Sequence, residues 1–223
     1  LSKSASASDT SLAGDEADLV AGVAWLWTCC HLAQPNYDPA TDQWIDRFAS
    51  MAAPELRRVA ALAHAGRAWA TIPPLLARLL EDNQAAVRAS ALWALMRRKS
   101  PAAREAVLKR TYDVDLDVMT QAVESLSLFP DQQTMRRLTE LQSHPAPRIR
   151  AAVVRAGAHM RQESLVLPAL TDSSAEVRSS VVGALIALAP NVADPAWRQL
   201  IAADRSSSVQ LAAVKATCEL PPE

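Results

Sequence analysis

Glycine and aromatic residues are scarce in this sequence. Five of its 223 residues are glycine, and phenylalanine, tryptophan and tyrosine together make up 4%. So few glycines leave little room for phosphate-binding loops, and the sequence has no P-loop, no dinucleotide-binding glycine motif and no GxSxG nucleophile motif. Half of the residues are hydrophobic, mainly alanine, leucine and valine. This composition favours closely packed helices over a β-sandwich or barrel, so we expect an all-α fold.

Cysteine is rare as well, and its spacing predicts no disulfide framework. The three cysteines, Cys29, Cys30 and Cys218, form no CxxC motif. Cys29 and Cys30 precede His31, but haem attachment needs CxxCH, and a zinc site needs further ligands at suitable spacing. We therefore expect the cysteines to be small buried hydrophobic residues and predict neither a cofactor nor a metal at this position.

The histidines are dispersed along the chain, without an HExxH motif or a His-Glu dipeptide. They are His31, His64, His144 and His159. Without such a motif, and without the glycine motifs named above, we find no catalytic group of residues and predict that the chain is not an enzyme.

A strong excess of positive charge is also missing. The formal net charge is −1, with seven acids and one lysine in residues 1–46, and 22 bases and 17 acids in residues 47–223. A nucleic-acid-binding domain usually carries a stronger and more clustered basic excess, so this class is disfavoured. We expect the basic runs Arg97–Lys99 and Arg136–Arg137 to be solvated, and the first to be favoured by a helix dipole.

The N-terminal part differs in composition from the rest. Residues 1–17 are rich in serine, alanine and aspartate, and we expect them to be flexible. Residues 19–34 carry no charge, but these 16 residues fall short of the roughly 20 that cross a bilayer, so we predict an apolar capping helix and linker over residues 18–40. Because the chain starts at Leu1, we expect a truncated or processed N-terminus, and we predict a cytoplasmic protein.

The feature most clearly present is a sixfold internal repeat. A large apolar residue, taken here as position zero, recurs at spacings of 31, 31, 31, 28 and 32 residues. These anchors are Leu56, Val87, Val118, Ile149, Val177 and Val209. Positions zero, four, seven and eight share one face of a helix, and positions four and seven are mostly alanine or valine. Each anchor therefore predicts a helix that packs closely against its neighbours, as in an α-solenoid.

Charged residues recur around each anchor. An aspartate stands five residues before it at Asp82, Asp113, Asp172 and Asp204, with His144 in the fourth repeat. An arginine follows it at Arg57, Arg88, Arg150 and Arg178. We expect the carboxylates to cap backbone N–H groups and to bridge arginines of the same or adjacent repeats. Met51, Met119 and Gln210 depart from this pattern and are expected to weaken it.

Proline positions predict a first helix before each of these second helices. Thr71 before Ile72 and Pro73, Ser100 before Pro101, and Asp194 before Pro195 place a cap residue next to a proline. Pro168 is expected to bend the first helix of its repeat.

The segments LLARLLEDNQAAVRASALWAL and PALTDSSAEVRSSVVGAL resemble HEAT repeats over about residues 41–218. The short repeat length is similar to the HEAT-like repeats of phycobilisome lyases, a type that also occurs in unrelated bacterial scaffolds. This resemblance implies a right-handed α-solenoid of about six helix pairs, with residues 41–223 as the repeat domain. It implies the architecture and leaves the activity open.

One acidic segment imitates a calcium-binding loop. Asp113, Asp115, Asp117 and Glu124 stand at loop positions one, three, five and twelve. Position six needs a glycine for a sharp turn, and Val118 occupies it here. We therefore expect an acidic turn without a metal.

Positions two, six and nine of each second helix lie opposite its buried face, and we expect them to line a concave inner surface. From these positions we predict the following partner-binding residues: Arg58, Trp93, Met96, Glu124, Arg155 and Lys215. Trp93 and Arg155 are the candidate hot spots, although Trp93 could equally pack against the next repeat. We predict a non-catalytic scaffold or adaptor for a protein or peptide. Two alternatives rest on resemblance, to HEAT-like alkylpurine glycosylases that bind nucleic acid and to chromophore lyases.

Overall fold

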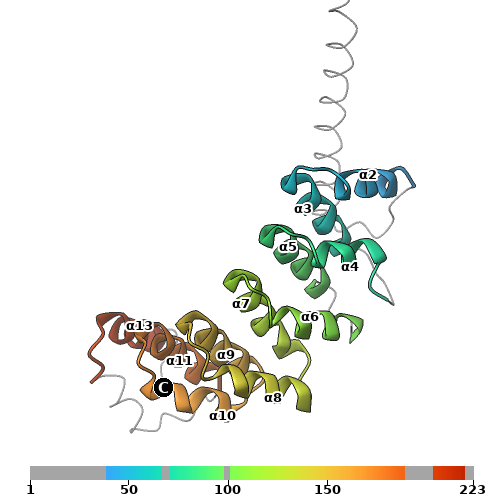
Figure 1. Cartoon of the computed structure of the whole chain (residues 1–223). Helices are drawn as coiled ribbons and strands as arrows, with labels where there is room; N and C mark the ends of the chain where they lie inside the picture. Colours follow the sequence, from blue (N-terminus) through green and yellow to red (C-terminus); the bar gives the residue numbers. More distant parts are fainter. Residues whose placement is uncertain (1–38, 67–70, 98–100, 189–202, 219–223) are drawn as a thin grey trace, which may run out of the picture. The chain divides into compact units, whose positions relative to one another are not determined.

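The computed structural model describes residues 39–66, 71–97, 101–188 and 203–218 (Figure 1). These ranges contain eleven α-helices and four short 3₁₀ helices, and no β-strand occurs within them. The all-α prediction is therefore confirmed for this part of the chain. None of its helices is both long and apolar enough to cross a membrane.

Several predictions fall outside the described residues. They concern the flexible segment 1–17, nearly all of the capping segment 18–40, the cysteine pair Cys29 and Cys30, and the helix caps Ser100 and Asp194. These stay predictions.

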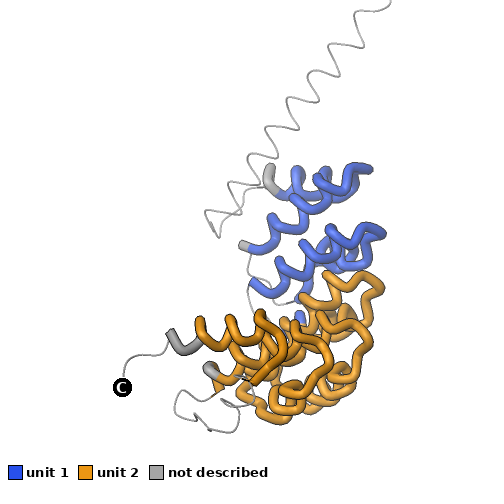
Figure 2. The backbone as a smooth tube through the Cα atoms, turned by 90° about the vertical axis from the view of Figure 1, so that its left-hand side faces the viewer, with its two compact units in different colours: residues 1–103 blue, residues 104–223 orange. Residues whose placement is uncertain are grey.

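The chain forms two compact units, residues 1–103 and 104–223 (Figure 2). The first unit contains α2 (Pro39–Ala49), α3 (Pro54–Ala63), α4 (Pro74–Leu80) and α5 (Ala85–Met96). The second contains α6 (Arg104–Arg110), α7 (Leu116–Ser125), α8 (Gln132–Leu141), α9 (Pro147–His159), α10 (Glu163–Val166), α11 (Ala175–Leu188) and α13 (Ser207–Cys218). A single continuous domain over residues 41–223, and its right-handed sense, stay predictions.

The predicted repeat register agrees with the observed burial. The second helices of the repeats are α3, α5, α7, α9, α11 and α13, and each contains one anchor near its start. Five of the six anchors are buried, and the first, Leu56, is half-buried. Position four is fully buried in the first five repeats, at Ala60, Ala91, Ala122, Val153 and Val181. Small and branched side chains thus let consecutive second helices pack closely within each unit.

The start of α4 differs from the prediction. The helix begins at Pro74, and Pro73 stands at its N-cap with φ −57° and ψ 136° and no side-chain cap. A residue that precedes proline is pushed out of the α-helical region, and Pro73 itself precedes a proline. Two consecutive prolines therefore delay the helix by two residues, so the prediction that Thr71 caps it is wrong.

Pro168 interrupts the first helix of its repeat, as the sequence predicts. The α-helical part, α10, ends at Val166, and Leu167–Thr171 continue as a 3₁₀ helix with Pro168 in its first turn. A proline in that turn needs no N–H donor, so the change of helix type accommodates the ring without breaking a helical hydrogen bond.

A sharp reversal connects α9 to α10. The N–H of Gln162 donates to the carbonyl of Gly157 at 2.8 Å, and the N–H of Arg161 donates to that of Ala158 at 3.1 Å. This pair of bonds is a Schellman motif, in which the residue after the C-cap adopts a left-handed conformation. Here that residue is Arg161, with φ 54°.

Gly157 lets α10 pack directly on α9. A Cβ atom at this position would lie 2.7 Å from Leu165 Cβ and 3.2 Å from Val166 Cγ2. Separations below 3.0 Å do not occur between real carbon atoms of this kind, so only glycine fits without a shift of the helices. Gly183, at position six of α11, has nothing within 4 Å of such a Cβ.

Candidate functional site

Arginine–aspartate pairs link neighbouring repeats inside each unit. Arg57 donates from Nε and Nη2 to both oxygens of Asp82, at 2.7 and 3.0 Å, and Arg178 does the same to Asp204 at 2.6 and 2.9 Å. Arg150 and Asp172 form an equivalent pair with two 2.7 Å bonds. Each arginine therefore bridges to the aspartate of the following repeat, which confirms the predicted pairing between repeats.

The same arginines also bind the turn of their own repeat. Nη1 of Arg57, Arg88, Arg150 and Arg178 donates to the main-chain carbonyl of the residue six positions earlier, at 2.7 to 2.9 Å. Nε2 of Gln210 makes the corresponding bond to the carbonyl of Asp204 at 2.7 Å. Because the acceptor is main chain, Met51 and Gln210 keep this contact, although the sequence pattern predicts that they weaken the repeat.

The turn aspartates also cap backbone N–H groups of their own turns, as predicted from their position. Oδ1 of each accepts the N–H of the residue two positions later, at 2.8 to 3.0 Å: Gln84 for Asp82, Asp115 for Asp113, Ser174 for Asp172 and Ser206 for Asp204. The hydrogen bond from its arginine is the largest effect on the pKa of Asp172 and of Asp204, and together with this N–H it outweighs burial and lowers both values. The carboxylates thus stay charged in the folded chain.

One pair is missing between the third and fourth repeats, where both partners are replaced together. The buried Met119 stands where four other repeats have arginine, and His144 stands where four other repeats have aspartate. Nδ1 of His144 accepts the N–H of Ala146 at 3.1 Å and so replaces the carboxylate in the turn. Two other ion pairs join α7 to α9 instead, Asp117 to Arg148 and Glu124 to Arg155.

A further ion pair was not predicted from the sequence. Asp131 caps α8 by accepting the N–H of Thr134 at 2.8 Å, and it also pairs with Arg104 at the start of α6. The hydrogen bond from Arg104, followed by that from Thr134, lowers the pKa of Asp131 to about 2. The only signal in the sequence is an aspartate just before a helix, which indicates a cap and says nothing of Arg104.

The acids that imitate a calcium loop each have a separate interaction. Asp113 pairs with Arg110 at 3.2 Å, and Asp115 caps α7 by accepting the N–H groups of Asp117 and Val118. Asp117 and Glu124 form the ion pairs to α9 described above. No group of three or more potential metal ligands comes together in the described part of the chain.

Position six of the second helices is open in every repeat, as predicted. The residues there are exposed or half-exposed: Leu62, Trp93, Glu124, Arg155, Gly183 and Lys215. The predictions for positions two and nine are wrong in several repeats, because Thr120 and Ala151 at position two and Ala65 and Ala158 at position nine are buried. In the fourth repeat, where Ala151 and Ala158 are both buried, the open stripe is one residue wide.

In the second unit two of the charged residues at position six form an ion pair. Arg155 Nε donates to Glu124 Oε1 at 2.7 Å, and Arg155 Nη1 lies 3.4 Å from Ser180 Oγ. The following repeats contribute Gly183, which has no side chain, and the exposed Lys215. Glu124 and Arg155, both predicted partner contacts, are thus each other's partners.

In the first unit, the side of the second helices that carries position six is apolar and basic. Trp93 is 43% exposed, and the guanidinium carbon of Arg97 lies 5.4 Å from the centre of its ring. Half-buried Met96 follows on α5, and α3 contributes half-buried Leu62 and exposed Arg58. We call these five residues the Trp93 face. It contains three of the six predicted contact residues, and it adds Arg97, which the sequence suggested was only a solvated helix end.

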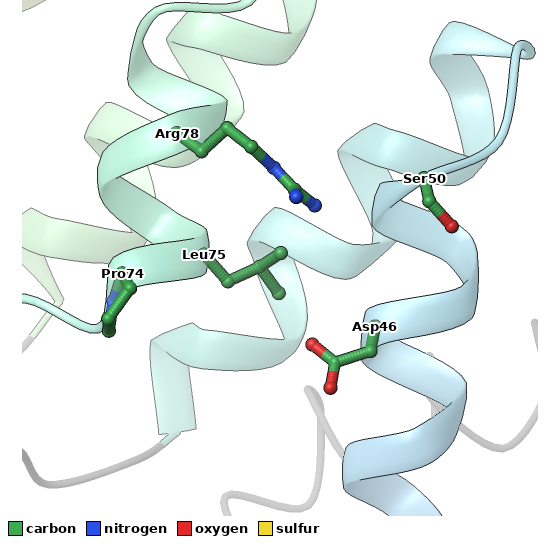
Figure 3. Close-up of a pocket in the computed structure, with 5 residues that line it drawn as sticks. All are labelled: Asp46, Ser50, Pro74, Leu75 and Arg78. Carbon is green, nitrogen blue, oxygen red and sulfur yellow. The ribbon is translucent and has the colours of Figure 1, made fainter.

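A hollow of about 430 Å³ lies elsewhere in the first unit, between the first helices α2 and α4 (Figure 3). Asp46 and Ser50 line it from α2, and Pro74, Leu75 and Arg78 line it from α4. All of these residues except Leu75 are exposed. An open hollow of this kind lacks the enclosing wall of a typical small-molecule site.

An exposed aromatic residue also lies in the turn before α7. Tyr112 is 64% exposed, and the guanidinium of Arg137 stacks on its ring at 3.6 Å. Arg137 is held by two bonds to Thr111, at 3.0 Å to Oγ1 and 2.9 Å to the carbonyl. The ring is therefore fixed in place, and it provides a second exposed aromatic group outside the Trp93 face.

Comparison with known protein families matches residues 41–127 to HEAT repeats. The match includes the first three second helices, and therefore the whole Trp93 face. No curated protein matches the chain. The helix pairs, the buried anchors and this match agree, and residues 41–127 of the chain are HEAT repeats.

Proposed function

We propose that this chain is a non-catalytic scaffold or adaptor that binds a partner protein through the Trp93 face. HEAT repeats typically mediate protein interactions, and stacked repeats present an extended surface for this purpose. The observation that carries the proposal is Trp93 itself, a large aromatic side chain that remains 43% exposed in the last turn of α5.

The composition of the Trp93 face supports this role. Tryptophan and arginine are the residue types most enriched among interface hot spots, and here Arg97 lies against the Trp93 ring. Leu62 occupies position six of the preceding repeat, and the 2.7 Å bond between Glu124 and Arg155 indicates that position-six side chains of consecutive repeats reach each other. A rigid helix pair also lowers the ordering cost of binding.

The distribution of reactive side chains supports a non-catalytic role. Among the histidines that the structure describes, His64 follows the end of α3 in the first unit, whereas His144 precedes α9 and His159 ends it in the second unit. General acid–base chemistry needs such groups within hydrogen-bond reach of one substrate atom. The predicted cytoplasmic location stays a prediction.

Capture experiments with the full chain test the proposal. The chain would be immobilised and exposed to extract of its native source, with and without nuclease treatment, in parallel with Trp93→Ala and with Tyr112→Ala as a matched exposed-aromatic control. We expect a discrete protein that cross-links near α3 and α5, is lost with Trp93→Ala and is retained with Tyr112→Ala. Equal capture by all three forms, or recovery of nucleic acid alone, contradicts the proposal.

A further inference from the structure

We propose that the segment bound by the Trp93 face is acidic, with aspartate or glutamate residues on either side of aliphatic or aromatic ones. This inference rests on the proposed function and adds the chemistry of the partner. The inference is based on the charged side chains that the structure describes in the first unit. Some of them lie on the Trp93 face, and others are paired elsewhere.

The Trp93 face carries positive charge and lacks negative charge. Arg58 on α3 and Arg97 after α5 are both exposed. The helix α5, Ala85–Met96, contains no aspartate or glutamate, and the only acid of α3 is Glu55 in its first turn. A bound carboxylate would therefore meet two guanidinium groups without crossing a region of like charge.

Two of the acids that the structure describes in the first unit have another partner or another position. Asp82 is held by Arg57 through two hydrogen bonds, and the N–H of Gln84 donates to it as well. Asp46 lines the hollow between the first helices α2 and α4. Within the ranges that the structure describes, neither Arg58 nor Arg97 forms a salt bridge with a carboxylate, and their side chains contact Ser90 and Trp93 instead.

In the second unit, two charged side chains at the equivalent position pair with each other. There, Glu124 and Arg155 occupy position six of consecutive repeats and form an ion pair at 2.7 Å. The corresponding residues of the first two repeats are Leu62 and Trp93, which cannot neutralise a neighbouring arginine. At position six the second unit thus has the ion pair of Glu124 and Arg155, whereas the first unit has Leu62 and Trp93 near Arg58 and Arg97.

Both arginines contact neighbouring side chains of the Trp93 face. The guanidinium carbon of Arg97 lies 5.4 Å from the centre of the Trp93 ring, so an acid bound there also lies beside the aromatic surface. Nε of Arg58 donates to Ser90 Oγ at 3.4 Å, which leaves its two terminal nitrogens for a bidentate contact. Leu62 and Met96 provide the aliphatic area between them.

A peptide fits this surface better than a nucleic acid. Two cations neutralise two phosphates at most, and affinity for a nucleic-acid backbone depends on many such contacts. Leucine and methionine side chains accommodate other apolar side chains, and methionine adapts to several shapes. The apolar part of the surface therefore has a use in a protein complex that it lacks against phosphate and sugar.

Selection from a library of displayed random peptides tests the inference. Peptides of about 16 residues, long enough to follow two consecutive repeats, would be selected on the full chain after depletion on Trp93→Ala. We expect enriched sequences that combine acidic residues with leucine, phenylalanine or tryptophan. The affinity of a synthetic peptide from this set should fall about tenfold or more in Arg58→Glu/Arg97→Glu, and it should not change in Arg78→Glu, a control on the other side of the unit.

The outcomes separate the two proposals. Enriched peptides that require Trp93 but lack acidic residues, or that bind Arg58→Glu/Arg97→Glu unchanged, overturn the acidic partner and leave the scaffold function intact. Failure to enrich any peptide that depends on Trp93 argues against the function itself. Displacement of the peptide by a labelled single-stranded oligonucleotide at equal concentration overturns the inference in favour of nucleic acid. Circular dichroism of each variant checks that its helices are unchanged.

Discussion

Replacement of Gly157 by alanine should destabilise the second unit, although alanine is the better helix former. The new Cβ would lie 2.7 Å from Leu165 Cβ, and Leu165 is 1% exposed and has no free side to move into. Forcing a methyl group into a packed contact costs about 1–3 kcal/mol, and the alanine returns about 0.5–1 kcal/mol of helix propensity. We therefore expect a net loss of about 1–2 kcal/mol in the free energy of unfolding.

Gly183 provides the matched control, because the same substitution there meets open space. It lies inside α11, is exposed, and has nothing within 4 Å of the added Cβ. Only the propensity term remains, so Gly183→Ala should stabilise the chain by about 0.5–1 kcal/mol. The two variants should therefore differ by about 2–3 kcal/mol with opposite signs.

Urea unfolding followed by circular dichroism measures both effects. The midpoint should move down for Gly157→Ala and up for Gly183→Ala, with unchanged slopes that indicate the same exposed surface on unfolding. A stabilised Gly157→Ala variant would refute the close packing of α9 on α10. A shift of equal size and sign in both variants would show that propensity alone decides the outcome.

Three further predictions concern the turns and ion pairs. Arg161→Gly should stabilise the chain by about 1 kcal/mol, because glycine adopts a positive φ without cost, and no change in the urea midpoint would contradict this. The double variant Met119→Arg/His144→Asp should create the missing pair, with a coupling of about 1–2 kcal/mol in a double-mutant cycle, whereas additive single effects would exclude it. The pKa of Asp131 is lowered, so its contribution is complete above its ordinary value of about 4 and is lost as the pH falls toward 2. Between these pH values the stability of Asp131→Asn should therefore change less than that of the wild type, and parallel curves would argue against the pair with Arg104.

Much of the fold could be predicted from the repeat register, because burial repeats with the sequence. The anchors and the small residues at position four are apolar and recur on one helix face, so they are expected in the core. Their spacing therefore locates every second helix. The start of α4 could not be found by counting caps, since Thr71 has the right side chain and the consecutive prolines after it have the stronger effect. Local backbone sterics decided that boundary.

The position of the site could be predicted from the sequence, but the contacts between its side chains were predicted less well. Trp93 and Met96 were found because the register places them away from the core. The pairing of Glu124 with Arg155 was missed, although opposite charges at the same position of consecutive repeats are a usable signal. Arg97 was assigned only a helix-dipole role, because its contact with the Trp93 ring depends on a rotamer that spacing does not determine.

The replaced pair between the third and fourth repeats has a consequence for cooperativity. In a linear array, each repeat contributes its own stability, and the interfaces between neighbours determine whether they unfold together. Where arginine and aspartate are paired, as in Arg150 and Asp172, both side chains are nearly shielded from solvent, at 13% and 12% exposed. The ion pairs that take their place, Asp117 to Arg148 and Glu124 to Arg155, are 40% to 70% exposed. Dissolved ions screen exposed pairs far more than shielded ones, so raising the ionic strength should weaken this junction first and make the second unit melt less as a single body.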